Sequence, residues 1–370
     1  MDVGTLISDI VKATEPLPLK RKDWRIGCIG AGFIMRDCHL VAYSDLGLEV
    51  AAIASKEREN SEKVAQRHGI PKVYNDWQSL LQDDSLEIID IAIPPHIQLD
   101  VVREACKRPN IKGILCQKPV AMSLADAREI ARIGQGSGVE IAVNSNMRYD
   151  QSMRALKYIL DQRLLGKPII ATIEMRAIPH WQEFLKAYDK LELFGMGIHH
   201  LDIFRYLFGD PERITALCRT DPRSQFPHLD GITQYTYQYA DGMMAGSLDD
   251  VWAWPNEPCE KDNYIKWRVE GTDGMADGTI GWPAYPVRQP STLRFTSKSY
   301  PGAWIEPSWD TVWFPDAFRG TMSELLWAIE NNAQPPSLSI ADNITTIACV
   351  EACYQSIKEE RTVKLADVLA

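Results

Sequence analysis

One stretch decides the fold of this chain: Arg25-Ile26-Gly27-Cys28-Ile29-Gly30-Ala31-Gly32-Phe33-Ile34. An apolar run typical of a buried strand ends at Gly30-Ala31-Gly32, and a helical pattern then continues to about Tyr43. In such a loop the first glycine allows a tight turn, and the second lets backbone N–H groups approach a pyrophosphate at the helix N-terminus. Met35 stands where the usual fingerprint has its third glycine, so the loop alone is also compatible with a purely structural turn.

The segments that follow alternate between strand and helix patterns. Strands are expected at residues 49–54, 73–74, 86–93, 111–116 and 141–143, and helices at 61–68, 77–81, 99–107 and 123–136. This alternation is typical of βαβ units around a parallel sheet. In that context we expect Gly30 and Gly32 to bind a dinucleotide rather than to form a structural turn.

After about Met147 the pattern changes to longer, β-rich runs. One helix is expected at 152–164, strands at 169–176, 214–219, 233–240, 243–252, 264–270 and 292–296, and closing helices at 321–330 and 342–358. Because no long helix separates most of these strands, the sheet should be mainly antiparallel. We therefore predict an N-terminal arm (1–23), an α/β Rossmann domain with a parallel sheet (24–147), and an α+β domain with a large open, mainly antiparallel sheet (148–370).

Composition narrows the function further. A chain of 370 residues exceeds one ordinary hydrophobic core, and its net charge of −10 disfavours nucleic acid as a partner. No stretch approaches the ~20 apolar residues of a membrane span, and acidic residues interrupt the first 23 positions, so we expect neither a membrane protein nor a signal peptide. Eight cysteines without a Cys-x-x-Cys pair indicate reduced thiols in the cytoplasm.

The turn after the second strand bears on the choice between NAD and NADP. Glu57 is a possible acceptor for the ribose hydroxyls of NAD, whereas Ser55, Lys56 and Arg58 suit a 2′-phosphate. The turn therefore favours NADP, with NAD as the open alternative and a solvated basic turn as the structural interpretation.

Lys118 follows a buried strand within Cys116-Gln117-Lys118-Pro119. A lysine at the carboxyl end of a parallel strand points into the crevice where the nicotinamide lies, and it can stabilise alkoxide character on a substrate hydroxyl. Without the fold context, a surface lysine would be the simpler interpretation.

A pair of histidines begins a helix in Gly197-Ile198-His199-His200-Leu201-Asp202. A histidine there with an aspartate three residues on can be an oriented acid/base, although a structural histidine is the alternative. Neighbouring histidines point in different directions, so we expect at most one to be catalytic. His-His neighbours rarely chelate one ion together, and no second cluster accompanies them, so no metal site is expected.

Together these pieces resemble the glucose-fructose oxidoreductase / inositol dehydrogenase / rhizopine-catabolism (Gfo/Idh/MocA) family over nearly the whole chain from Trp24. The family's glycine-rich loop corresponds to Gly30–Gly32, its Glu-Lys-Pro motif to Gln117–Pro119, and its Gly-x-His-x-x-Asp helix start to Gly197–Asp202. The resemblance implies an NAD(P)-dependent enzyme that oxidises or reduces a secondary hydroxyl of a sugar or polyol. It also implies that Lys118 contacts this hydroxyl, that His199 is the acid/base or its partner, and that the open sheet forms a homodimer or homotetramer.

The expected site is wider than these two residues. The cofactor should contact Gly30, Gly32, Phe33, Ile34, Ser55, Lys56, Arg58, Ile93, Pro94, Pro95, His96, Gln117 and Lys118. The polar segment 144–150, which could also be a hydrogen-bonded linker, lies where an interdomain cleft would form. The substrate side is expected to include Asn146, Arg148, Tyr149, Arg176, His180, Trp181 and His200.

Two departures from the family pattern concern the chemistry. Gln117 replaces the acid of Glu-Lys-Pro, and Gly195 stands where many family dehydrogenases have an aspartate four residues before the histidine. A Lys-Asp-His triad is thereby reduced to a pair. Two alternatives stay open: a lyase, isomerase or hydrolase that uses tightly bound NAD(P) without net redox change, and a dinucleotide-binding regulator without catalysis.

Overall fold

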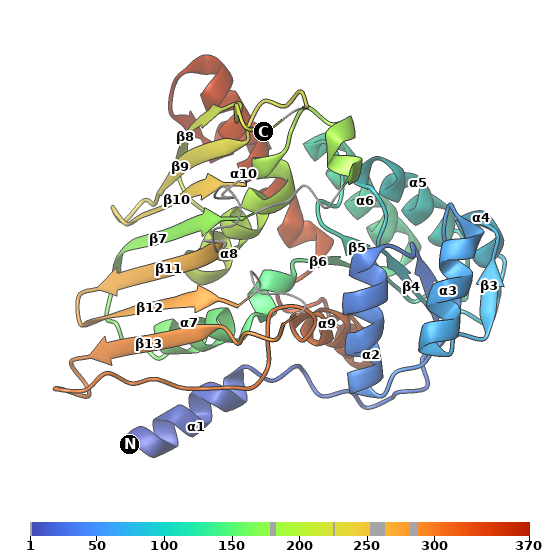
Figure 1. Cartoon of the computed structure of the whole chain (residues 1–370), viewed down its shortest axis with the longest axis horizontal. Coiled ribbons are helices and arrows are strands. Elements are labelled where there is room, and N and C mark those ends of the chain that lie inside the picture. Colours follow the sequence, from blue (N-terminus) through green and yellow to red (C-terminus); the bar gives the residue numbers. More distant parts are fainter. Residues whose placement is uncertain (1, 178–182, 225, 252–262, 282–286) are drawn as a thin grey trace. The chain divides into compact units, whose positions relative to one another are not determined.

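The computed structural model describes every residue except 1, 178–182, 225, 252–262 and 282–286 (Figure 1). The chain divides into two compact units. The Rossmann unit contains residues 16–149 and 314–347, and the sheet unit contains residues 1–15, 150–313 and 348–370. Both units are assembled from separate segments, unlike the contiguous ranges expected from the sequence.

The Rossmann unit contains a six-stranded, entirely parallel sheet in the order β3-β2-β1-β4-β5-β6. Its strands are β1 (Ile26–Ile29), β2 (Val50–Ala54), β3 (Lys72–Tyr74), β4 (Ile88–Ile91), β5 (Gly113–Gln117) and β6 (Glu140–Asn144). Its helical segments are a π-helix (Ile34–His39) that continues as α2 (Leu40–Leu46), α3 (Arg58–His68), α4 (Trp77–Leu80), α5 (Pro95–Ala105), α6 (Leu124–Ser137) and a 3-10 turn (Asn146–Tyr149). The predicted parallel sheet is confirmed.

The ends of two helices test the local predictions. Ser123 caps α6 as expected, because its Oγ accepts a hydrogen bond from the backbone N–H of Asp126 at 3.1 Å. The expected start of the preceding helix at Leu99 is wrong: α5 begins at Pro95. Proline is favoured in the first helical turn, where its missing N–H has no intrahelical partner to lose.

Helix α9 (Ala317–Asn331) explains why residues 314–347 belong to the Rossmann unit. It packs on β5 and β6, and the absence of a side chain at Gly113 leaves room for Ile329. The hydroxyl of Tyr149 donates to Glu324 of the same helix. Sequence periodicity identified this helix but could not show which sheet it covers.

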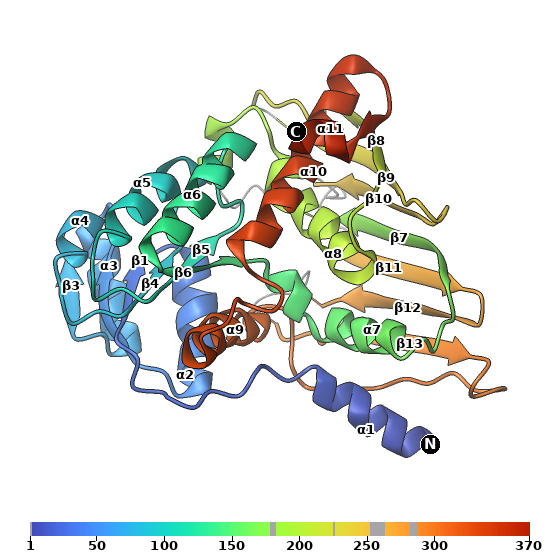
Figure 2. The same cartoon turned by 180° about the vertical axis from the view of Figure 1, so that it is seen from behind.

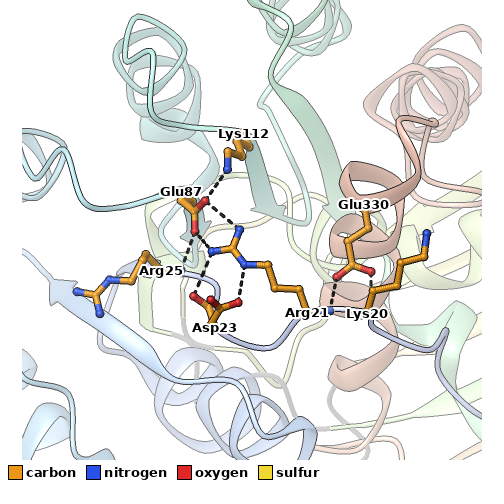
Figure 3. A network of polar contacts seen from close by, with 7 residues as sticks. All are labelled: Lys20, Arg21, Asp23, Arg25, Glu87, Lys112 and Glu330. Atoms are coloured by element: carbon orange, nitrogen blue, oxygen red, sulfur yellow. Dashed lines mark hydrogen bonds and ion pairs between the residues drawn. The ribbon is translucent and has the colours of Figure 1, made fainter.

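The segment before β1 is fastened to the same unit through two carboxylates (Figure 3). Glu330 accepts hydrogen bonds from the backbone N–H groups of Lys20 and Arg21 at 2.9 and 3.0 Å. Glu87 receives the guanidinium of Arg21 at 2.6 and 3.1 Å and the ammonium of Lys112 at 2.5 Å. Burial alone would raise the pKa of Glu87, but these hydrogen bonds outweigh it and hold the pKa at about 2.

The sheet unit contains eight strands in the order β13-β12-β11-β7-β10-β9-β8-β14. They are β7 (Pro168–Arg176), β8 (Arg213–Arg219), β9 (Ile232–Gln238), β10 (Met244–Asp250), β11 (Tyr264–Gly271), β12 (Gly274–Ile280), β13 (Thr292–Ser297) and β14 (Val363–Lys364). Among the strands that the structure describes, only the β7–β10 pair is parallel, so the expected mainly antiparallel sheet is confirmed. Strand β12 escaped prediction because its glycines and Asp277 interrupt the alternation of apolar residues.

Helices cover one face of this sheet (Figure 2). They include α7 (Gln151–Asp161), α8 (Ile198–Phe208) and the later part of α10 (Ile340–Glu359), and α11 (Leu365–Leu369) ends the chain. Short π and 3-10 helices, Leu193–Gly197 and Glu183–Ala187, precede α8. The hydroxyls of Tyr237 on β9 and of Tyr239, directly after it, donate to α8 carbonyls, which fixes the helix on the sheet.

The expected N-terminal arm is a helix of the sheet unit. Helix α1 (Val3–Ala13) packs on α7 and buries Leu6 and Ile10. Its N-cap is Asp2, whose carboxylate accepts from the backbone N–H of Thr5 at 3.0 Å. Residues 16–23 instead belong to the Rossmann unit, so residues 1–23 are divided between the two units.

Candidate functional site

The glycine loop after β1 requires its first glycine. Gly30 has a φ of +110°, and a Cβ there would lie 2.3 Å from the carbonyl oxygen of Ala92. Its backbone N–H donates to the carbonyl of Ala54 at 2.8 Å, which holds the turn across the ends of neighbouring strands. A Cβ at Gly32 would meet nothing within 4 Å. The loop is thus closed against the sheet at Gly30 and open at Gly32, as an approaching phosphate requires.

The helix after this loop supplies the second half of an anion site. Phe33 occupies the N-cap position, and its hydrocarbon side chain cannot accept a hydrogen bond from the first helical amides. Ile34 begins the helix directly behind it. Backbone N–H groups and the helix dipole therefore favour negative charge here. These residues fit the pyrophosphate of a dinucleotide.

The turn after β2 is partly used by internal contacts. Ser55 donates to the carbonyl of Glu57 at 2.8 Å and pairs with the Ser61 hydroxyl at 2.7 Å. Arg58 donates to Glu62 at 2.8 Å and to the side chain of Asn75. Lys56 is exposed. A ribose 2′-phosphate could therefore contact the exposed ammonium of Lys56. It could contact the exposed guanidinium of Arg58 only if Arg58 leaves Glu62 and Asn75.

The loop after β4 lies next to the glycine turn, since Ile93 contacts the Cβ position of Gly30 at 3.3 Å. Pro94 is half-buried, Pro95 begins α5 and His96 is exposed. This loop therefore lies beside the closed end of the glycine turn, within the same unit.

Two amide side chains, those of Gln98 and Gln117, hold the backbone around Lys118. Gln98, which is fully buried on α5, donates to the carbonyls of Gln117 and Pro119 at 2.9 and 3.0 Å. The Oε1 of Gln117 accepts from the backbone N–H of Lys118 at 2.9 Å. Burial lowers the pKa of the Lys118 ammonium to about 7, so near neutral pH it can hold or release a proton.

The histidines of α8 have different surroundings in the sheet unit. His200 is fully buried, and its Nδ1 lies 3.0 Å from Oδ2 of Asp249 on β10. His199 is 3% exposed and stands edge-on to Trp313, with ring centroids 5.3 Å apart. His200 is thus held by a carboxylate in the core, whereas the ring of His199 packs against an indole.

The position where the family has an aspartate has space for a side chain. Within the described part of the chain, a Cβ at Gly195 would meet only the methyl groups of Leu185 at 3.7 Å, an ordinary contact. A carboxyl group is nevertheless close in sequence, at Glu192. This side chain is fully buried and accepts a hydrogen bond from the Thr233 hydroxyl at 2.5 Å. Burial and the nearby charge of Asp249 raise the pKa of Glu192. Sequence reasoning missed this residue, although an acid within the apolar run Leu191–Phe194 was a visible signal.

The other expected substrate residues have varied environments. Arg148 bonds the carbonyl of Ser337 and pairs with Asp342 at 2.8 Å, while Asn146 and Tyr149 are buried in the same unit. Arg176 donates to the carbonyls of Met175 and Leu248 at 2.8 and 3.2 Å. Expected ligands that lie outside the described residues are His180 and Trp181.

Among the described residues, no group of three or more His, Cys, Asp or Glu side chains could hold a metal ion. Within the same ranges, no helix has both the length and the apolar character needed to cross a bilayer.

Comparison with known proteins covers both units. The family described as "Oxidoreductase family, NAD-binding Rossmann fold" matches residues 24–145, and "Oxidoreductase family, C-terminal alpha/beta domain" matches residues 180–365. D-apiose dehydrogenase from Paraburkholderia graminis is 27% identical over 99% of this chain and 96% of its own length. D-xylose 1-dehydrogenase (NADP(+)) 2 from Haloferax volcanii is 24% identical over 86% of this chain and 92% of its own.

A solved structure shows the same fold. It is an oxidoreductase from Agrobacterium radiobacter in complex with NAD+, L-tartaric acid and magnesium. The TM-score is 0.80 at 22% identity, and the match covers 93% of this chain and 99% of that one.

Proposed function

Because the chain belongs to the Gfo/Idh/MocA oxidoreductase family and is an NAD(P)-dependent sugar oxidoreductase, we propose that it oxidises and reduces one secondary hydroxyl through Lys118 and His199. The substrate is a sugar, a polyol or a sugar derivative. The observation that carries the proposal is the half-buried Lys118 in the loop after β5, whose backbone is fixed by Gln98 and Gln117 and whose pKa is lowered to about 7. D-apiose and D-xylose, the sugars named for the relatives, are the first candidates.

The cofactor residues follow from the loop geometry. Gly30, Gly32, Phe33 and Ile34 bind the pyrophosphate through backbone amides, and residues 93–96 border it. The nicotinamide ring supplies hydride transfer when it is bound, whereas the protein supplies orientation and electrostatics. Exposed Lys56 and Arg58 support NADP over NAD.

The two catalytic residues divide the work on the hydroxyl. Lys118 hydrogen-bonds the hydroxyl oxygen and stabilises its alkoxide character. His199 takes the hydroxyl proton on oxidation and returns it on reduction. Gly195 provides no carboxylate to orient His199, and Trp313 packs edge-on against its imidazole ring.

The functional division of the chain is also part of the proposal. Residues 24–147 bind the dinucleotide, whereas residues 148–370 recognise the substrate and form the oligomer. Substrate contacts are assigned to Asn146, Arg148, Tyr149, Arg176, His180, Trp181 and His200.

We further propose a cytoplasmic homodimer or homotetramer. Cys28, Cys38, Cys106, Cys116, Cys218, Cys349 and Cys353 are free thiols, as in a reducing compartment. Leu217 and Leu248 both pair across the sheet with Gln234, so they share a face, and they are 65% and 41% exposed. Apolar side chains in such positions suit packing against a second copy.

One assay tests the chemistry. The purified protein is mixed with NADP or NAD and a panel that includes D-apiose, D-xylose, polyols and glycosides, and nicotinamide absorbance is followed. Substrate-dependent reduction that falls at least about 100-fold in both Lys118→Ala and His199→Ala is the expected result. Full activity in either variant would refute the role given to that residue. Bound nucleotide without turnover across the panel would instead favour internal redox chemistry or sensing.

A further inference from the structure

A buried hydrogen-bond network lies behind the cofactor loop of the Rossmann unit. His39, in the π-helix, and Asp90, on β4, are both fully buried. Oδ2 of Asp90 lies 2.7 Å from Nδ1 of His39 and accepts the hydroxyl of Tyr43 at 2.6 Å. Phe318 packs on the imidazole ring, with centroids 5.0 Å apart. Burying a carboxylate and an imidazole is costly unless both are paired, and here each group is a partner of the other.

The network continues from the other imidazole nitrogen toward Lys118. Nε2 of His39 lies 2.9 Å from Nδ2 of Asn144 and 3.4 Å from Nε2 of Gln117. Gln117 is oriented by its neighbour, because its Oε1 accepts the backbone N–H of Lys118. Its amide nitrogen therefore faces the imidazole.

This orientation decides where the histidine carries its proton. An amide NH2 group can only donate, so Nε2 of His39 must present a lone pair. The proton then lies on Nδ1 and is donated to Asp90, which selects one tautomer. The chain of contacts runs from the Asp90 carboxylate through His39 and Gln117 to the backbone of Lys118.

We propose that His39, oriented by Asp90, is a positioning residue that holds Lys118 in place through Gln117. The proposal rests on the proposed function, in which Lys118 contacts the reacting hydroxyl. It also explains the departure from the Glu-Lys-Pro motif in this chain. A carboxylate at residue 117 could only accept a hydrogen bond and would need a proton on Nε2, whereas the Gln117 amide can donate to the Nε2 lone pair and still accept from Lys118.

Gln98 makes a second set of hydrogen bonds to the loop that carries Lys118. It donates to the carbonyls of Gln117 and Pro119, the residues directly before and after Lys118 in the chain. Its contacts do not involve His39. Loss of His39 should therefore loosen the lysine loop on one side without releasing it entirely.

The test compares His39→Phe with Tyr43→Phe. Each variant removes one buried hydrogen bond to the same oxygen of Asp90, but only His39 leads on to Gln117. Both should lower the melting temperature by several degrees. We expect kcat to fall about 10- to 100-fold in His39→Phe, with KM for the sugar changed less than about threefold, and to stay within about twofold of wild type in Tyr43→Phe.

A second readout does not depend on activity. Acetic anhydride labels the neutral amine, so the labelling rate of Lys118 against pH, followed by mass spectrometry, reports its environment. The midpoint should lie near pH 7 in the wild type and in Tyr43→Phe. It should rise by at least about 1 pH unit in His39→Phe, because a loosened loop lets water reach the amine. Gln117→Met, which removes the same link at a half-buried residue, should behave like His39→Phe.

The outcomes separate the two proposals. If His39→Phe and Gln117→Met keep the wild-type midpoint and kcat, the positioning role is wrong, whatever their stability. If Lys118→Ala remains active, the assigned function of Lys118 fails, while the labelling shift still decides whether His39 positions this lysine. A shift in both variants with none in Tyr43→Phe supports the proposal.

Discussion

A Cβ at Gly197 would lie 2.7 Å from Oε1 of Glu192, so the buried carboxyl group fills the space that a side chain at residue 197 would need. The backbone of Gly197 has a φ of −56°, which any residue can adopt. The requirement for glycine is therefore steric, and it arises because the carboxyl group is fixed by Thr233.

The first prediction compares two neighbouring glycines. Gly197→Ala should destabilise the protein by about 1–3 kcal/mol, because the added methyl group overpacks against Glu192. Gly195→Ala is the matched control, since its Cβ makes only 3.7 Å contacts, and it should be neutral or stabilising by up to about 1 kcal/mol. Urea unfolding of both variants measures the difference. Equal effects would show that the Glu192 contact does not decide the choice of glycine.

Glu192 itself should show a pH-dependent effect on stability. Burial and Asp249 raise the pKa of Glu192 above its ordinary value of 4.5. Above pH 4.5 the carboxyl group ionises in the unfolded chain but keeps its proton in the folded one, so the free energy of unfolding falls as pH rises. Glu192→Gln lacks this proton linkage and should gain stability relative to wild type between pH 4.5 and 7. Parallel stability curves over that range would contradict a raised pKa.

Restoring the family's aspartate is a third test. Gly195→Asp places its Cβ in ordinary contact with Leu185, so the variant should fold. A carboxylate four residues before His199 would favour the charged imidazole and orient it, so we expect kcat to rise about tenfold and its pH dependence to move to higher pH. Gly195→Asn is the uncharged control. Lower kcat in the aspartate variant would indicate that this site operates without the third member of the triad.

Lys118 should reduce stability at neutral pH. Its pKa falls from 10.5 to about 7 on folding, so the unfolded chain binds more protons between these values and the free energy of unfolding rises with pH across this window. Lys118→Met should therefore be more stable than wild type by roughly 1–3 kcal/mol at pH 7, with the gain shrinking toward pH 10. Denaturant unfolding at several pH values measures it. A gain that does not change with pH would refute the lowered pKa.

Glu87, unlike Lys118, stabilises the folded state, and this contribution is lost at acidic pH. The folded state holds its pKa at about 2 against an ordinary value of 4.5, so its contribution is complete above pH 4.5 and is lost as pH falls toward 2. At pH 7 we expect Glu87→Gln to cost about 1–3 kcal/mol, because Arg21 and Lys112 lose their shared carboxylate. Denaturant unfolding measured from pH 7 to pH 2 should show the gap closing below pH 4.5. A gap that persists at pH 2 would point to packing instead.

The sequence by itself determined the fold class and the main catalytic candidates of this protein. The evidence came from three local patterns: the strand–Gly30-Ala31-Gly32–helix segment, the lysine after a buried strand, and the histidines at a helix start. Such patterns can be recognised in a sequence because backbone propensities and periodicity act over a few residues. Their order along the chain was sufficient to indicate the family, the parallel sheet and the dinucleotide.

Only the tertiary structure decided which residues support these candidates. His39 and Asp90 are 51 positions apart in sequence, Gln98 and Pro119 are 21 apart, and Glu192 and Thr233 are 41 apart. Helix α9 likewise joins a sheet whose last strand ends at Asn144. No periodicity records such pairings, because they arise when separate strands and helices pack together and buried polar groups must find partners.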